Sequence, residues 1–117
     1  MTPTPELRTK LRKLLDERIP EGGSDADTRF SDADVDELLS EAANIYGAAA
    51  AGWTLKAAMF QREAGQIQSY SVGQERYDLA KAKDMLEYAL KMAETYSKLS
   101  ASATGSIVLR FEPPEVI

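Results

Sequence analysis

The chain has 117 residues with a formal net charge of −5, and it contains neither cysteine nor histidine. This length fits one domain with a modest core. The missing cysteine excludes disulfides, thiolate-bound metals and thiol nucleophiles, and the missing histidine removes the commonest general base and metal ligand. No apolar run approaches the roughly 18 residues of a membrane span, and the N-terminus lacks a signal-peptide core, so we expect an unsecreted protein without a membrane partner.

The charge is unevenly distributed along the chain. Residues 1–20 carry five basic and three acidic groups, whereas residues 21–41 carry one basic and eight acidic groups. The remaining residues carry eight of each. Because affinity for nucleic acid rests on Lys and Arg that neutralise phosphates, this distribution argues against sequence-specific DNA binding.

The first predicted element is a helix from Glu6 to Arg18. Pro20 and the two glycines after it end the element. We expect its basic residues to form a solvated face. Its apolar face is made of leucines at helical spacing, namely Leu7, Leu11, Leu14 and Leu15.

An acidic loop follows at residues 21–31, and it contains a short repeat. The tetrapeptide Ser-Asp-Ala-Asp occurs at Ser24 and again at Ser31. The second copy predicts a helix start, with Ser31 as the N-cap, acids in the first turn, and then Val35, Leu38, Leu39 and Ala42. Alternating aspartates also suggest calcium, but neither register provides the glycine and the bidentate glutamate of an EF-hand loop. We therefore favour helix capping and predict no metal site.

The next predicted helix is rich in alanine and spans Ala42 to Ala64. We expect a kink or break near Ala43–Gly47, because glycine is unfavourable inside a helix. Trp53 is expected in the core or in a subunit interface. The apolar stripe consists of Ile45, Ala49, Trp53, Ala57, Phe60 and Ala64.

The segment at about residues 67–77 predicts a β-hairpin, with Gly73-Gln74 as a two-residue turn. A long helix capped by Asp78 then runs from Leu79 to Leu99. Its apolar arc is wider than a small monomer requires, which indicates contacts between subunits.

The tail predicts a linker at residues 100–106 and an extended strand at Ile107–Phe111, which ends before Pro113 and Pro114. Such a tethered strand could be lent to the sheet edge of another chain. The predicted partner-binding residues come from the hairpin and from this strand: Tyr70, Val72, Gly73, Arg76, Ile107, Val108, Leu109 and Phe111.

The sequence thus predicts an all-α fold. It is a small helical bundle at residues 1–99 with a short β-hairpin between the two main helices, followed by a linker and an extended C-terminal arm at residues 100–117. None of the sequence motifs GxSxG, Walker A, GxGxxG or HExxH is present. We therefore expect no catalytic residues and no cofactor, and a structural protein rather than an enzyme.

The layout of residues 30–99 resembles the head–tail connector proteins of tailed bacteriophages, also called adaptors. The resemblance rests on the acidic helix start RFSDADVDELLSEA, the alanine-rich helix with Trp53 and Lys56-Ala57-Ala58, the Ser69–Gly73 segment, and the long helix with Tyr88-Ala89. In that family a Ser-Val-Gly segment joins two main helices in this order. The C-terminal residues 107–117 depart from the family pattern.

The resemblance implies a virion protein of the phage neck, made in the host cytoplasm. It implies a homo-oligomeric ring, commonly of twelve copies, that binds the portal protein on one side and a stopper or tail component on the other. Genomic DNA would pass through its channel without sequence-specific binding. Two alternatives are a small helical interaction module, such as an antitoxin or regulatory subunit, and a DNA-packaging accessory protein that contacts DNA through its first helix.

Overall fold

The computed structural model describes the backbone of residues 1–68 and 74–109, and the side chains of residues 1–67 and 79–103. Every regular secondary-structure element in this part of the chain is a helix. The elements in chain order are α1 (Pro5–Leu15), the short 3₁₀ helix η1 (Asp25–Asp27), α2 (Asp32–Glu41), α3 (Ile45–Gln68) and α4 (Gln74–Leu109).

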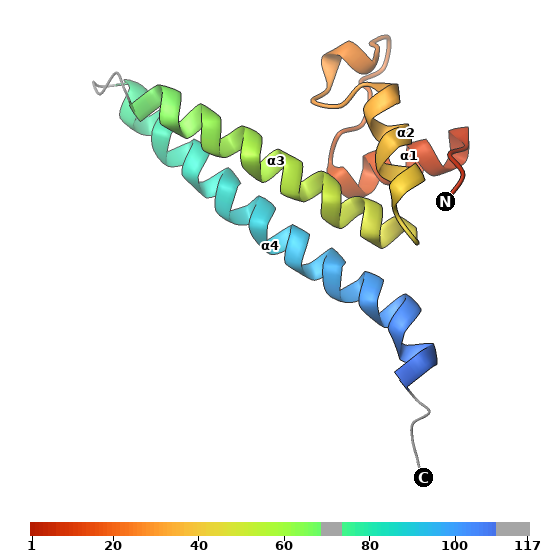
Figure 1. Cartoon of the computed structure of the whole chain (residues 1–117). Coiled ribbons are helices and arrows are strands. Elements are labelled where there is room, and N and C mark those ends of the chain that lie inside the picture. Colours follow the sequence, from red (N-terminus) through yellow and green to blue (C-terminus); the bar gives the residue numbers. More distant parts are fainter. Residues whose placement is uncertain (69–73, 110–117) are drawn as a thin grey trace.

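The two longest helices, α3 and α4, lie side by side and form the long body of the molecule (Figure 1). The short helices α1 and α2 pack at the end of α3 where that helix begins. Since a helix rises about 1.5 Å per residue, the 36 residues of α4 span about 54 Å. The radius of gyration is accordingly 17.6 Å, against about 13 Å for a compact chain of this length.

Helix α1 begins and ends at residues that satisfy its free backbone groups. Thr4 is the N-cap, and its side chain accepts a hydrogen bond from the Leu7 amide at 3.1 Å. Asp16 ends the helix in the left-handed region, with φ of 58°. The helix therefore stops three residues before the predicted end at Arg18.

Both copies of the Ser-Asp-Ala-Asp repeat are capping boxes. In each copy the serine side chain accepts a hydrogen bond from a backbone amide in the first turn, that of Ala26 or Asp34. The side chain of the second aspartate in turn accepts from the serine amide. The Asp34 carboxylate lies 3.0 Å from the Ser31 amide, and the Asp27 carboxylate lies 2.8 Å from the Ser24 amide. The predicted helix start at Ser31 is confirmed, and the break between α2 and α3, at residues 42–44, overlaps the predicted region.

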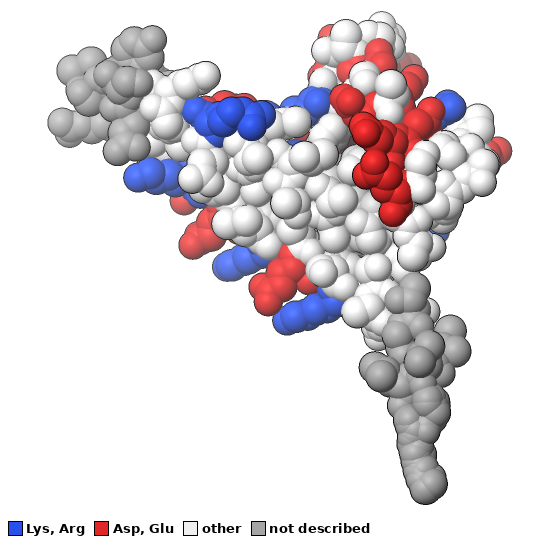
Figure 2. Space-filling view, viewed as in Figure 1, with Lys and Arg blue, Asp and Glu red and all other residues white. Residues whose placement is uncertain are grey.

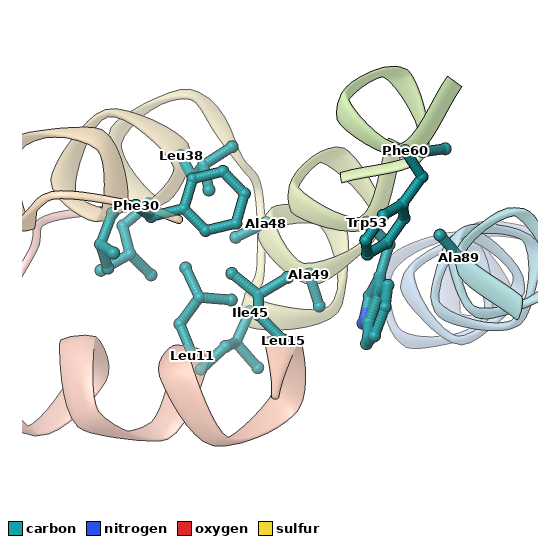
Figure 3. Close-up of a cluster of buried hydrophobic side chains, with 13 residues drawn as sticks. Leu11, Leu15, Phe30, Leu38, Ile45, Ala48, Ala49, Trp53, Phe60 and Ala89 are labelled. Atoms are coloured by element: carbon teal, nitrogen blue, oxygen red, sulfur yellow. The ribbon is translucent and has the colours of Figure 1, made fainter. Parts of the chain in front are cut away.

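The hydrophobic core gathers around α3 (Figure 3). One face of α3 meets α1, α2 and the Phe30 side chain, and another face carries Trp53 and Phe60 toward α4. Trp53 is buried, and its Nε1 donates to the Leu14 carbonyl at 2.9 Å. The predicted apolar stripe is buried throughout: Ile45, Ala49, Trp53, Ala57, Phe60 and Ala64.

The predicted β-hairpin at residues 67–77 is wrong. Helix α3 continues through Gln68, and α4 already begins at Gln74, so the second predicted strand is helical. Glu75 and Arg76 favour helix more than strand, and they precede a strongly helical sequence that extends backward over them. Residues 69–73, including Tyr70, Val72 and Gly73, lie outside the described residues.

The predicted linker and extended arm are also wrong over the described residues. Helix α4 runs without interruption from Leu99 through residues 100–106 to Leu109. Alanine and serine dominate this stretch, and alanine has the highest helix propensity of all residues, so an established helix propagates through it. Residues 110–117, including Phe111, lie outside the described residues.

Candidate functional site

The predicted partner-binding residues are not brought together as two strands. Arg76, Ile107, Val108 and Leu109 belong to the two ends of α4, which are separated by most of the length of that helix. The other predicted residues, Tyr70, Val72, Gly73 and Phe111, lie outside the described residues. The buried charged side chains lie elsewhere, at the contacts between α1, the acidic loop and α3.

Arg12 is a buried charged side chain that the sequence analysis placed on the surface. It was expected on a solvated face, but it is buried between α1 and the acidic loop. Its guanidinium donates to the Glu17 carbonyl at 3.1 Å, to Thr28 Oγ1 at 3.0 Å and to the Phe30 carbonyl at 2.9 Å, and it pairs with Asp32 at 3.0 Å. Since a guanidinium offers five donors in a fixed fork, Arg12 can anchor the whole loop onto α1.

Lys56 is the second buried charge, on α3. Its Nζ lies 2.7 Å from the Glu17 carboxylate, 2.8 Å from the Leu15 carbonyl and 4.3 Å from the centre of the Trp53 ring. Both members of this ion pair are buried, with side-chain exposures of 4% and 10%. The pair ties the C-terminal end of α1 to the middle of α3.

A polar hollow of about 420 Å³ opens beside this ion pair, between the end of α1, α3 and α4. Arg29 crosses it, paired with Glu63 at 2.7 Å and stacked 4.5 Å above the Phe60 ring. Four of the charged side chains that line the hollow form ion pairs with one another, namely Lys56 with Glu17 and Arg29 with Glu63. Among the described residues, no group of three or more Asp or Glu side chains is placed to hold a metal ion.

The α3–α4 pair also carries an uncharged outer face. Figure 2 shows this surface between the charged edge of α4 and the acidic α2. On α4, Lys81 lines the hollow beside α1. Leu90 lies nine residues later, and at about 100° per residue it therefore lies on the side of α4 opposite to Lys81 and the hollow. Leu90 is 54% exposed. On α3, exposed residues of the same outer side recur at intervals of three or four: Ala51, Thr54, Ala58 and Gln61.

Comparisons with known proteins identify no relative, because no family model, no curated protein and no solved structure matches the chain. In the part of the chain that the structure describes, no helix is sufficiently long and apolar to cross a membrane. The functional argument therefore rests on the residues and on the surfaces they form.

Proposed function

We propose that this chain is a structural subunit of an oligomeric assembly, and specifically a head–tail connector of a tailed phage. In this role it joins the portal to the next neck or tail component as a ring. Two observations carry the proposal: the uncharged surface of the α3–α4 pair in Figure 2, and the exposure of the large apolar side chain of Leu90 on α4.

The order of elements supports the connector rather than another assembly. An acidic capped helix, an alanine-rich helix with Trp53 and a longer second helix occur in the order expected from the resemblance. The two long helices end and begin on either side of residues 69–73, where the family has its Ser-Val-Gly junction. A ring also needs two different contact surfaces on each subunit, and an elongated two-helix body provides two long flanks.

The proposed function predicts an effect on virion assembly. In a phage that carries this gene, its deletion should leave heads without attached tails, as seen by electron microscopy of lysates. Complementation by the unaltered gene should restore tailed particles. Normal tailed virions after deletion would contradict the proposal.

A matched pair of variants tests the outer face directly. Leu90→Glu places a charge in the uncharged surface and should reduce both complementation and the mass of the purified assembly, measured by native mass spectrometry alone and with portal. Thr95→Glu adds the same charge at an exposed position about 140° around α4 and should leave assembly unchanged. Circular dichroism should show equal helicity in both variants. Equal assembly by both would show that this face is not the contact.

A further inference from the structure

A groove runs along the junction of α2 and α3, and it adjoins the outer face of the α3–α4 pair at Ala51. One hollow of about 340 Å³ has an apolar base of Phe30, Leu38, Leu55 and Met59. A second hollow of about 310 Å³ adjoins it, and the two share Leu38 and Glu41. The shared residues make the hollows one elongated groove, which the second hollow extends with small residues: Ala42, Gly47 and Ala51.

The rim of this groove carries only acidic charge among the described side chains that line it. Three carboxylates of α2 border it, from Asp34, Glu37 and Glu41. Asp34 is engaged in its capping box. The side chains of Glu37 and Glu41 form no hydrogen bond or ion pair with another described residue, and they are exposed and lie one helical turn apart. The acidic surface of α2 is conspicuous in Figure 2.

Two positive groups near the groove are engaged elsewhere. Arg29 approaches Met59 but is paired with Glu63. The amino group of Met1 lies at the end of α2, where it donates to the carbonyls of Leu39 and Ala42 at 3.0 and 2.8 Å. Neither group neutralises Glu37 or Glu41. The rim therefore carries two carboxylates that form no ion pair with a described residue, beside the apolar side chain of Leu55, which is 47% exposed.

We propose that this groove binds a basic amphipathic helix of a partner protein. Apolar side chains of the partner would lie on Leu55 and Met59, and its Lys or Arg side chains would pair with Glu37 and Glu41. Helix-in-groove recognition of this kind uses apolar anchors at positions i, i+3, i+4 and i+7 of the bound helix. These anchors span eight residues, and the ten-residue α2 is long enough to lie along all of them. The opposite charge on the two surfaces would speed association and set the orientation of the partner. The inference does not depend on the connector assignment.

The test uses the full chain and a synthetic amphipathic peptide of about 14 residues with leucine anchors and flanking lysines. Fluorescence anisotropy of the labelled peptide should show saturable binding. The double variant Glu37→Lys/Glu41→Lys should raise its Kd at least about tenfold, in line with the loss of two charge pairs at a partly desolvated rim. Leu55→Ser should weaken binding without altering the charge. The matched control Asp84→Lys/Glu87→Lys makes the same charge change at exposed positions of α4 and should leave the Kd unchanged.

Each other outcome contradicts the proposal. If a peptide with glutamate in place of lysine binds equally well, charge pairing does not drive the binding. If a peptide with the same lysines but a scrambled order of apolar residues binds equally well, the amphipathic pattern does not matter. Equal weakening by the groove variant and the α4 control would indicate non-specific attraction. If the protein alone is an oligomer that Glu37→Lys/Glu41→Lys dissociates, and no peptide binds, then a second copy fills the groove.

Discussion

At the scale of single residues, two buried cations determine how the short helices attach to the body. Arg12 ties the acidic loop to α1, and Lys56 ties α1 to α3. A buried charge is costly unless it is paired and hydrogen-bonded, and both residues meet this condition. Their neighbours are backbone carbonyls and carboxylates that lie far apart in the sequence, so these contacts fix tertiary geometry rather than local structure.

Replacement of Lys56 by Met should destabilise the fold by about 3–5 kcal/mol, because Glu17 would remain buried without its cation. Urea unfolding followed by circular dichroism measures the change. The double variant Lys56→Met/Glu17→Gln should recover most of that loss, since no uncompensated charge remains. The control Lys98→Met removes a solvent-exposed pair with Glu94 and should cost less than about 1 kcal/mol. A similar loss in both single variants would contradict the assigned role of Lys56.

Tyr96 should make stability depend on alkaline pH. Burial raises the pKa of its phenol, and the neighbouring Tyr88 and Tyr46 raise it further. Its ring stacks on that of Tyr46 with centroids 6.2 Å apart. A raised pKa favours the neutral phenol in the folded state, so this contribution is complete below the unfolded pKa of about 10 and is lost as the pH rises through the folded pKa. The unfolding free energy should therefore fall more steeply above pH 10 in the wild type than in Tyr96→Phe. Parallel curves for the two proteins would contradict this.

At the scale of the elements, the crossing of α1 over α3 depends on a close approach at Gly52. A Cβ atom at this position would lie 2.5 Å from Leu15 Cδ2. Alanine-rich sequence on α3 allows the same approach on either side, at Ala48 and Ala49, which are fully buried. The small residues of α3 therefore determine where the α1 leucines can pack.

The two glycines of α3 should respond to alanine in opposite directions. Gly52→Ala should destabilise by about 1–3 kcal/mol, because the new methyl group overpacks the Leu15 contact. Gly65→Ala meets no atom within 4 Å of the added Cβ and should stabilise by about 0.5–1 kcal/mol through helix propensity. Thermal unfolding of both variants measures the difference. Stabilisation by Gly52→Ala would show that α1 does not cross α3 at this point.

At the scale of the whole molecule, charge is segregated and the basic helix α1 is partly neutralised from within. Arg8 pairs with Asp36 at 2.6 Å, and Arg12 is buried against Asp32. Two of the five basic residues in the first twenty are thereby engaged by α2. The surface that remains around α2 is acidic and repels phosphate.

This charge distribution predicts negligible affinity for duplex DNA. Fluorescence anisotropy with a labelled duplex at about 25 mM salt, where electrostatic contacts are weakly screened, should detect no saturable binding. A DNA-packaging accessory role requires the opposite result. Binding at low salt that Lys10→Glu/Lys13→Glu abolishes would favour that alternative over the connector.

The sequence by itself determined the helical class, the apolar stripe of α3, the break before Ile45 and the capping role of the second Ser-Asp-Ala-Asp copy. These features depend on local spacing and on hydrogen bonds between residues at most three or four apart. Local reasoning failed where a short segment was weighed alone. Residues 74–77 and 100–109 have mixed propensities, and the adjoining long helix extends through them.

Only the tertiary structure decided which charged side chains are buried and where the groove lies. Nothing in the pattern of α1 separates buried Arg12 from its exposed neighbour Lys13, because the partners of Arg12 come from residues up to twenty positions later. The groove likewise exists only where α2 lies against α3. Its one sequence signal is the pair Glu37 and Glu41, one turn apart beside the buried stripe of α2, and its apolar base is assembled from residues that the chain brings together on folding.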